Sequence, residues 1–563
     1  MPGTQPMVFK TPRRKAWLRA NHIAWAILLI GLAAPAALML RRNLSALGLH
    51  HDVIYPEAAD VQLALWTAQT GRVFPPLQRP PFTPAIYGPL FYLALAALAR
   101  PFHFSLHALL LAGRLGSLAA YLGLGCVVYL FNRRRGYGWP ACLAAALALG
   151  ASPGFSAWII CARPDLGALF FSLLGLWLAQ RGAQAGGVPP ESYWIWAGAA
   201  CSTAWLLKQS YAAAPLAVLA WLVFTRRRKA SLLFLAACAL PALLVLGTLW
   251  LRGEPVLVSL LRLRYALMQP RIGLSILIDQ LRLPGNLLLL GLGGLGWLRA
   301  GRPVMPARRG QAWTLAAIYF PLAWTLPVWP ILQSGGGGNY LFEAWTACAL
   351  WLPEGLRALA AWSEPIEKRL KTSPLALSRA LAGAGIGLLI AAMAGLFGAR
   401  LLQPSYIVRQ RSYGNLKLLR PLRIFSSDDY LTVHGRQPEL LDPDLAHILS
   451  LTGHFSDAPI RARLRRRRYD LLLLGNWWGA LPAYRGVSYY SRAEIQSINR
   501  YYRPLCATRG LTAWIPKTLP PKSSPLPLHP AQLSHTLRLH CRPREFVLLT
   551  SGRYQFSALP AKR

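Results

Sequence analysis

Apolar residues fill most of the first 400 positions in long runs, and short polar segments between the runs carry most of the charge. The runs are about 15 to 25 residues long, which is the length of helices that cross a bilayer. Because backbone groups in hydrocarbon must form their hydrogen bonds within their own segment, this pattern predicts a polytopic α-helical membrane protein. We expect about eleven spans, at about residues 22–40, 107–131, 139–160, 166–178, 194–207, 211–224, 232–251, 283–298, 312–332, from 343 onward, and 375–397. The shorter apolar run at 87–99 predicts a helix that lies along the outer interface.

Basic residues mark one side of this membrane domain. Lys10, Arg13, Arg14, Lys15 and Arg19 precede the first span, and arginine clusters follow the second and sixth spans. By the positive-inside rule the N-terminus lies in the cytoplasm, so the loop of about residues 41–106 lies outside. An odd number of spans places the C-terminal region outside as well. The predicted location is the cytoplasmic membrane.

Residues 400–563 have a different pattern from the membrane domain at 1–399. The segments 420–428 and 469–478 are short apolar runs bounded by charge, which is typical of buried strands. The segment 441–453, between them, has helical periodicity. This order predicts a small extracytoplasmic α/β domain. The fold class is therefore an all-α polytopic membrane protein with a small α/β C-terminal domain.

The composition supports a membrane protein and excludes some partners. The 563 residues are 54% hydrophobic, and the formal net charge is +41. This charge has two interpretations, attraction to anionic lipid phosphates or an arginine-rich composition combined with basic inner loops. Nucleic acid is excluded as a partner because the basic residues are scattered and no groove-reading motif occurs. Cys506 and Cys541 form either a disulfide or two free thiols.

Ionisable side chains recur at the outer ends of separate helices, although the chain has only 20 acidic residues. The acids Asp52, Glu57 and Asp60 lie in the first outer loop. Further groups are Arg163 and Asp165 after the third span, Lys208 between the fifth and sixth, and Asn339 and Glu343 at the tenth. A charge at membrane depth costs several kcal/mol unless it is paired or lines a wet cavity. We expect these groups to converge on one cavity; the alternative is that each is a solvated loop residue.

Several motifs resemble those of bacterial GT-C membrane glycosyltransferases, the group of protein mannosyltransferases and lipid A aminoarabinose transferases. The motifs are YPEA (55–58), YGPLFY (87–92), Arg114, ARPD (162–165), LLKQSYAAAPLAVLAW (206–221), GGNYLFEAW (337–345) and YDLLLLG (469–475). The resemblance covers nearly the whole chain. It implies an enzyme that moves a sugar from a polyprenyl-phosphate donor to a glycan, lipid or protein acceptor at the outer face.

The resemblance also implies roles for individual residues. An acid of the first outer loop is placed at the acceptor in this group, often within an Asp-Glu pair. This chain has Pro56-Glu57 at that point, so Glu57 takes the role of base by position. Asp165 is a second catalytic candidate, and Lys208 and Arg163 are candidates for holding the donor phosphate. The predicted substrate-binding residues are Asp60, Tyr87, Asn339, Tyr340 and Glu343.

The chemistry fits these residues. A lipid phosphate is a good leaving group that needs a cation beside it, whereas the acceptor hydroxyl needs a base within hydrogen-bond reach. One carboxylate acting as base predicts direct displacement with inversion, by analogy with glycosidases. No cofactor is certain, and no metal ligands are assigned. A divalent metal ion at Asp165 stays an open alternative, because acids of these loops bind one in some relatives.

A membrane transporter or flippase for a lipid-linked or polar solute is the alternative function. Transporters place charged groups near the bilayer midplane and often consist of repeated halves. Here the ionisable groups gather at one face, and the sequence shows no internal repeat. The pattern therefore favours the enzyme.

Overall fold

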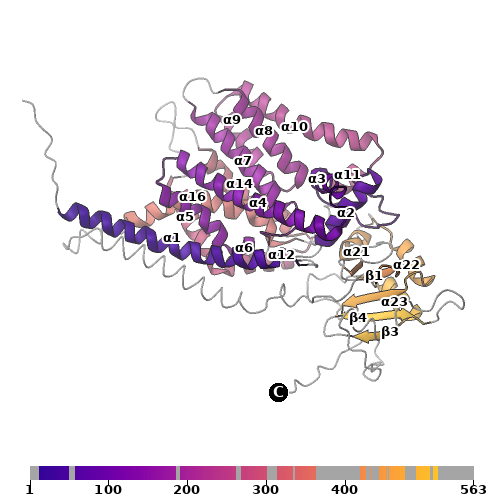
Figure 1. Ribbon diagram of the computed structural model, residues 1–563. Helices are drawn as coiled ribbons and strands as arrows, with labels where there is room; N and C mark the ends of the chain where they lie inside the picture. Colours follow the sequence, from indigo (N-terminus) through magenta and orange to yellow (C-terminus); the bar gives the residue numbers. More distant parts are fainter. Residues whose placement is uncertain are drawn as a thin grey trace, which may run out of the picture.

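The structure, a computed structural model, describes most of the membrane domain and parts of the C-terminal domain (Figure 1). The described residues are 12–49, 53, 57–156, 158–185, 190–260, 268–300, 314–333, 336–362, 419–426, 431–432, 443–451, 453, 455–475, 490–507 and 511–517. The predicted eleventh span at 375–397, the domain boundary near residue 400, Asp52 and Cys541 lie outside these residues.

Within the part of the chain that the structure describes, all the named elements of the membrane domain are helices, as the apolar runs predicted. They are α1 (Pro12–Ala46), α2 (Glu57–Thr70), α3 (Pro89–Ala99), α4 (Leu106–Arg134), α5 (Trp139–Ala151), α6 (Pro153–Ser156), α7 (Asp165–Gln184), α8 (Ser192–Leu207), α9 (Ala213–Phe224) and α10 (Arg228–Leu251). They continue with α11 (Val256–Leu260), α12 (Pro270–Arg282), α13 (Pro284–Ala300), α14 (Leu315–Thr325), α15 (Val328–Ile331), the 3-10 helix η2 (Gly338–Leu341) and α16 (Phe342–Trp362).

Each of the first ten predicted spans coincides with helix in the structure, but not every one is a single long helix. Within the described residues, four helices are long and apolar enough to cross a membrane alone: α1 from Trp25, α4, α7 and α10. The pair α12 and α13 forms a fifth if its 84° bend belongs to one span. The predicted span at 139–160 is wrong in its second half, because α5 ends at Ala151 and Pro153 follows. A proline cannot supply the backbone N–H that would continue the helix.

Small residues allow the helices of the membrane domain to approach closely. The pair α13 and α16 shows this best, because a side chain on either helix would meet the other helix's backbone. A Cβ on Gly293 would lie 2.6 Å from the Cα of Cys348, and one on Gly355 would lie 2.0 Å from the carbonyl oxygen of Leu292. Glycine contacts of this kind are typical of helix packing in lipid, where association depends on close van der Waals contact.

The predicted first outer loop forms a layer over one end of the membrane domain. Its helices α2 and α3 pack together in a buried cluster that includes Val61, Tyr92 and Leu109, and Val256 and Leu260 of α11 join that cluster. In Figure 1 this layer lies between the long helices and the C-terminal domain. The loop is thus a folded part of the protein, held from both sides.

The C-terminal domain contains a four-stranded mixed sheet, in the order β1-β2-β4-β3. The strands are β1 (Ile424–Ser426), β2 (Leu471–Gly475), β3 (Tyr502–Ala507) and β4 (Leu511–Pro516), and the helices are α21 (Pro443–Leu451), α22 (Ala458–Arg465) and α23 (Arg492–Tyr501). Strands β1 and β2 are parallel, and β4 is antiparallel to both β2 and β3. The predicted order of strand, helix and strand is confirmed.

Candidate active site

Asp165 is the centre of a buried polar cluster at the end of the membrane domain where α7 begins and α8 ends. It begins α7, where the helix dipole favours a negative charge. Its Oδ1 accepts hydrogen bonds from Lys208 Nζ and, at 2.6 Å, from Asn339 Nδ2. Lys208 is the residue that ends α8, and Asn339 lies in η2. Three elements far apart in sequence therefore meet at one carboxylate.

Arg163 joins a second carboxylate to this cluster. Its Nε lies 3.6 Å from Asp165 Oδ2 and 3.8 Å from Asp60 Oδ2, in the first turn of α2. These are ion-pair distances, too long for good hydrogen bonds. The side chains of Asp165 and Lys208 are almost fully buried, while that of Arg163 is 11% exposed. Two acids and two bases thus balance in formal charge at a depth where an unpaired charge is costly.

Aromatic rings surround the two cations. The ring of Tyr87 lies 5.2 Å from the guanidinium carbon of Arg163 and 5.5 Å from Lys208 Nζ. Trp158 lies 4.9 Å from the same guanidinium, and Tyr340 lies 4.8 Å from Lys208 Nζ. Ring faces attract cations and exclude water, so they hold Arg163 and Lys208 in place without consuming all of their hydrogen-bond donors.

Glu57 lies beside this cluster but is held differently. Its Oε1 accepts from Arg114 Nε at 2.9 Å and from the Ala162 amide at 2.6 Å. Its Oε2 accepts from Arg114 at 2.8 Å and from the Val53 amide at 2.9 Å. A carboxylate has about four acceptor positions, and here four donors fill them. Since both side chains are fully buried, this geometry speaks against the prediction that Glu57 is the base. The Glu57 carboxylate instead fastens the first outer loop to α4, through Arg114, and to the segment before α7, through the Ala162 amide.

Glu343 also forms a separate contact. Its Oε1 accepts from Ser172 Oγ of α7 at 2.9 Å, and its Oε2 accepts from the Ala213 amide at 3.3 Å. Ala213 is the first residue of α9, so the carboxylate caps that helix's N-terminus. The prediction that Glu343 binds substrate gains no support from these contacts.

The structure thus brings together seven of the nine residues that the sequence indicated. They are Asp60, Tyr87, Arg163, Asp165, Lys208, Asn339 and Tyr340. Only the two glutamates, Glu57 and Glu343, have other partners. Trp158 was missed, because a lone tryptophan in an apolar run gives no signal of contact with a cation.

The donor set does not fit a divalent metal ion. Such ions take several oxygen ligands, mostly carboxylates. Asp60 and Asp165 both face Arg163, and Asp165 also binds Lys208, so cations of the protein already occupy the space between them. Among the described residues, no group of three or more His, Cys, Asp or Glu side chains lies close enough to hold a metal.

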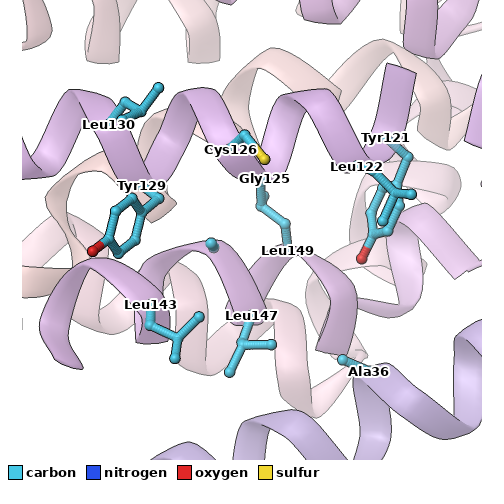
Figure 2. Close-up of a pocket in the computed structure, with 11 residues that line it drawn as sticks. Ala36, Tyr121, Leu122, Gly125, Cys126, Tyr129, Leu130, Leu143, Leu147 and Leu149 are labelled. Carbon is cyan, nitrogen blue, oxygen red and sulfur yellow. The ribbon is translucent and has the colours of Figure 1, made fainter. Parts of the chain in front are cut away.

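An apolar pocket lies elsewhere, among α1, α4 and α5 (Figure 2). Its volume is about 430 Å³, and its lining includes Ala36, Tyr121, Cys126, Tyr129 and Leu147. None of the predicted site residues lines it. The pocket offers no charge that would hold a phosphate, so we do not assign the reaction to it.

One family of known proteins matches part of the chain. Residues 87–250 match the family described as dolichyl-phosphate-mannose-protein mannosyltransferase. The matched segment contains Tyr87, Arg163, Asp165 and Lys208. No curated protein sequence matches the chain. The resemblance inferred from the motifs is confirmed by the family match.

The fold is similar to that of one enzyme of known structure. The chain is similar to ArnT from Cupriavidus metallidurans bound to undecaprenyl phosphate, with a TM-score of 0.50, 14% identity, and coverage of 85% of this chain and 97% of that one. The apo state of the same protein gives the same values. AglB, an oligosaccharyltransferase from Archaeoglobus fulgidus, matches with a TM-score of 0.47 and 11% identity over 88% of this chain and 75% of that one. The ArnT likeness shows the GT-C fold, and the family match indicates a glycosyltransferase.

Proposed function

We propose that this protein transfers a sugar from a polyprenyl-phosphate donor to an acceptor at the outer face of the bacterial cytoplasmic membrane. The observation that carries the proposal is the cluster of Arg163 and Lys208 beside two buried carboxylates. A lipid-linked sugar phosphate requires a cationic site at membrane depth, and this cluster supplies one. The ArnT of similar fold was crystallised with undecaprenyl phosphate, which makes that lipid the natural first probe.

Arg163 and Lys208 hold the donor phosphate and stabilise the charge that grows on it as the sugar leaves. An entering phosphate replaces part of the contact between these two cations and the carboxylates. The rings of Tyr87 and Tyr340 keep the cations in place. Because an anion that binds here replaces one ion pair by another, the site avoids burying an uncompensated charge.

Asp60 is the base in this proposal, in place of Glu57. It lies one helical turn after Glu57 in α2 and faces Arg163, so a sugar phosphate held by Arg163 lies next to it. Asp165 is less suited, since its Oδ1 already accepts two hydrogen bonds and two cations stabilise its charged form. Asp165 is therefore a positioning residue that orients Lys208 and Asn339.

The reaction is a single displacement. The acceptor hydroxyl gives its proton to Asp60, its oxygen forms a bond to the anomeric carbon, and the bond from that carbon to the phosphate oxygen breaks. The lipid phosphate takes the electron pair of the broken bond and leaves from its place between Arg163 and Lys208. Since the acceptor attacks from the side opposite to the leaving phosphate, the anomeric configuration inverts. The acceptor class, whether glycan, lipid or protein, is identified by the radiolabel transfer assay described below.

The outer-face assignment rests on the basic residues at the opposite helix ends. Arg133 and Arg134 end α4, Arg181 lies in the last turn of α7, and Arg228 begins α10. The site residues lie at the other ends of α7 and α8. By the positive-inside rule the arginine ends face the cytoplasm.

The test is transfer of a radiolabelled sugar from undecaprenyl phosphate to membrane fractions, with purified protein in nanodiscs. Asp60→Asn keeps the size of the side chain but removes the base, so kcat should fall by about 10² to 10⁴ with little change in donor binding. Glu57→Gln serves as the matched control, and its specific activity per folded molecule should fall less than that of Asp60→Asn.

Near-normal transfer by Asp60→Asn would overturn the assignment of the base. Movement of intact donor across a sealed vesicle, without release of undecaprenyl phosphate, would instead favour the transporter or flippase.

A further inference from the structure

The C-terminal domain holds one residue of the first outer loop within its own hydrophobic core. Phe82 is 1% exposed and belongs to the buried cluster formed by residues such as Phe425, Leu472 and Trp514 of the sheet. The guanidinium of Arg463, in α22, lies 5.2 Å from the centre of the Phe82 ring. The ring therefore anchors the loop in a domain that lies hundreds of residues away in sequence.

The backbone at this anchor has an uncommon conformation. Phe82 has a φ of 53°, in the left-handed region, which bulky residues rarely adopt. Its amide donates to the Arg79 carbonyl at 2.9 Å. Such a conformation persists where the surroundings hold it, and here burial of the ring does so.

Five residues further along, the same segment reaches the candidate active site. The Gly88 amide donates to the Leu207 carbonyl at 3.1 Å, directly before Lys208. A Cβ at Gly88 would lie 1.9 Å from the Leu206 carbonyl oxygen, so only glycine permits this approach. Gln209 also donates to the Ile86 carbonyl, at 3.4 Å. Tyr87, between these two contacts, packs against Arg163 and Lys208.

The connection between the two ends is short and buried. Thr83, Pro84 and Ala85 are all buried, and the Thr83 hydroxyl donates to the Pro81 carbonyl at 3.1 Å. Five residues span at most roughly 16 to 18 Å. Because the three residues after Phe82 are buried, the segment has little room to change its path when either end is displaced. A shift of Phe82 should consequently move Tyr87.

We propose that Phe82 is a positioning residue, through which the C-terminal domain sets the place of Tyr87 and thereby the geometry of the two cations. The C-terminal domain is on this account a structural part of the donor-phosphate site. That the responding anion is the donor phosphate rests on the proposed function. The mechanical connection from Phe82 to Tyr87 does not depend on it.

The test compares three full-length variants in nanodiscs. Phe82→Ala removes the anchoring ring, Phe82→Leu keeps an apolar side chain there, and Val258→Ala is the matched control. Val258 of α11 packs against the same C-terminal cluster but is outside the segment that leads to Tyr87. Hydrogen exchange of a peptide covering residues 83–92 reports the Gly88 amide, and titration with undecaprenyl phosphate reports anion affinity.

We expect Phe82→Ala to speed exchange in this peptide by about tenfold or more, because local opening follows the loss of buried contacts. Undecaprenyl phosphate should bind about tenfold more weakly. Phe82→Leu should bring the exchange rate and the affinity most of the way back to the wild-type values. Val258→Ala should change neither quantity, although it should speed exchange in strands β2 and β4.

Unchanged exchange at residues 83–92 in Phe82→Ala would overturn the inference, whatever the ligand result. Equal loosening of that peptide by Val258→Ala would overturn it too, since the effect would then be general. If Phe82→Ala does not fold, the comparison is made with the milder truncation Phe82→Val, for which exchange at residues 83–92 no faster than in Val258→Ala counts against the proposal. If exchange responds but wild-type protein binds no undecaprenyl phosphate, the connection stands and the proposed function fails.

Discussion

Two buried carboxylates, Glu57 and Asp165, differ in how completely they are bound. Four hydrogen bonds of 2.6 to 2.9 Å fill the acceptor positions of Glu57. Asp165 accepts two at Oδ1, while its Oδ2 accepts none from the part of the chain that the structure describes and faces Arg163 at 3.6 Å. Burial and charge are alike, so the difference lies in geometry. A saturated ion pair fastens elements together, whereas loosely held charges can exchange partners with a substrate.

The largest effect should follow from breaking the saturated pair. Arg114→Ala leaves Glu57 buried without its cation, which should cost about 3 to 5 kcal/mol of stability. Thermal unfolding of the purified protein in detergent measures this. The double variant Glu57→Gln, Arg114→Met removes both charges and should recover much of the loss. A stable Arg114→Ala protein that lacks transfer activity would show instead that this pair takes part in the reaction.

The loosely held cluster should respond in binding more than in stability. Lys208→Met keeps a side chain of similar length without its charge, and removes one charged contact to the donor phosphate. Affinity for undecaprenyl phosphate should fall by about 10- to 100-fold, the size expected for a charge-assisted hydrogen bond. Isothermal titration in nanodiscs measures it. Unchanged affinity together with a large loss of stability would show that Lys208, like Glu57 and Arg114, holds elements of the fold together and does not bind the donor.

Glu494 provides a third case, a buried acid in the C-terminal domain. Burial raises its pKa to about 7, and its contacts are those of a capping box with Ser491. Because its folded pKa lies above its unfolded value near 4.5, the stabilisation is full below about pH 4.5 and is lost as pH rises through about 7. The C-terminal domain should lose on the order of 2 kcal/mol over that range.

Hydrogen exchange in the sheet strands at pH 5, 6, 7 and 8 measures this loss, after correction for the intrinsic exchange rate. Glu494→Gln should flatten the profile because it removes the titrating group. A wild-type profile that is already flat would contradict the assignment.

The smallest effect should come from removing metal. Because Arg163 and Lys208 already neutralise the acids, treatment with EDTA should leave transfer within about twofold of the untreated enzyme. A required metal would contribute several kcal/mol, so its removal would cost far more than that. Activity that disappears with EDTA and returns with one divalent ion would contradict the poor fit of the donor set.

The sequence by itself determined the helical membrane class, and it indicated most of the residues of the candidate site. It also predicts that the basic helix ends face the cytoplasm. Long apolar runs leave the backbone no other structure in lipid, and the positive-inside rule orients them. The strand at 424–426 and the helix at 443–451 were likewise predicted, because their apolar residues are local signals. These features depend on neighbours along the chain.

Only the tertiary structure decided which acid is saturated. Glu57 carries the better family signal, yet its partners Arg114 and the Ala162 amide come from other segments of the chain. The same holds for Phe82 inside the C-terminal domain. A hydrogen bond or ring contact depends on distances of a few ångströms between segments that are far apart in sequence, and no pattern within one segment contains that distance.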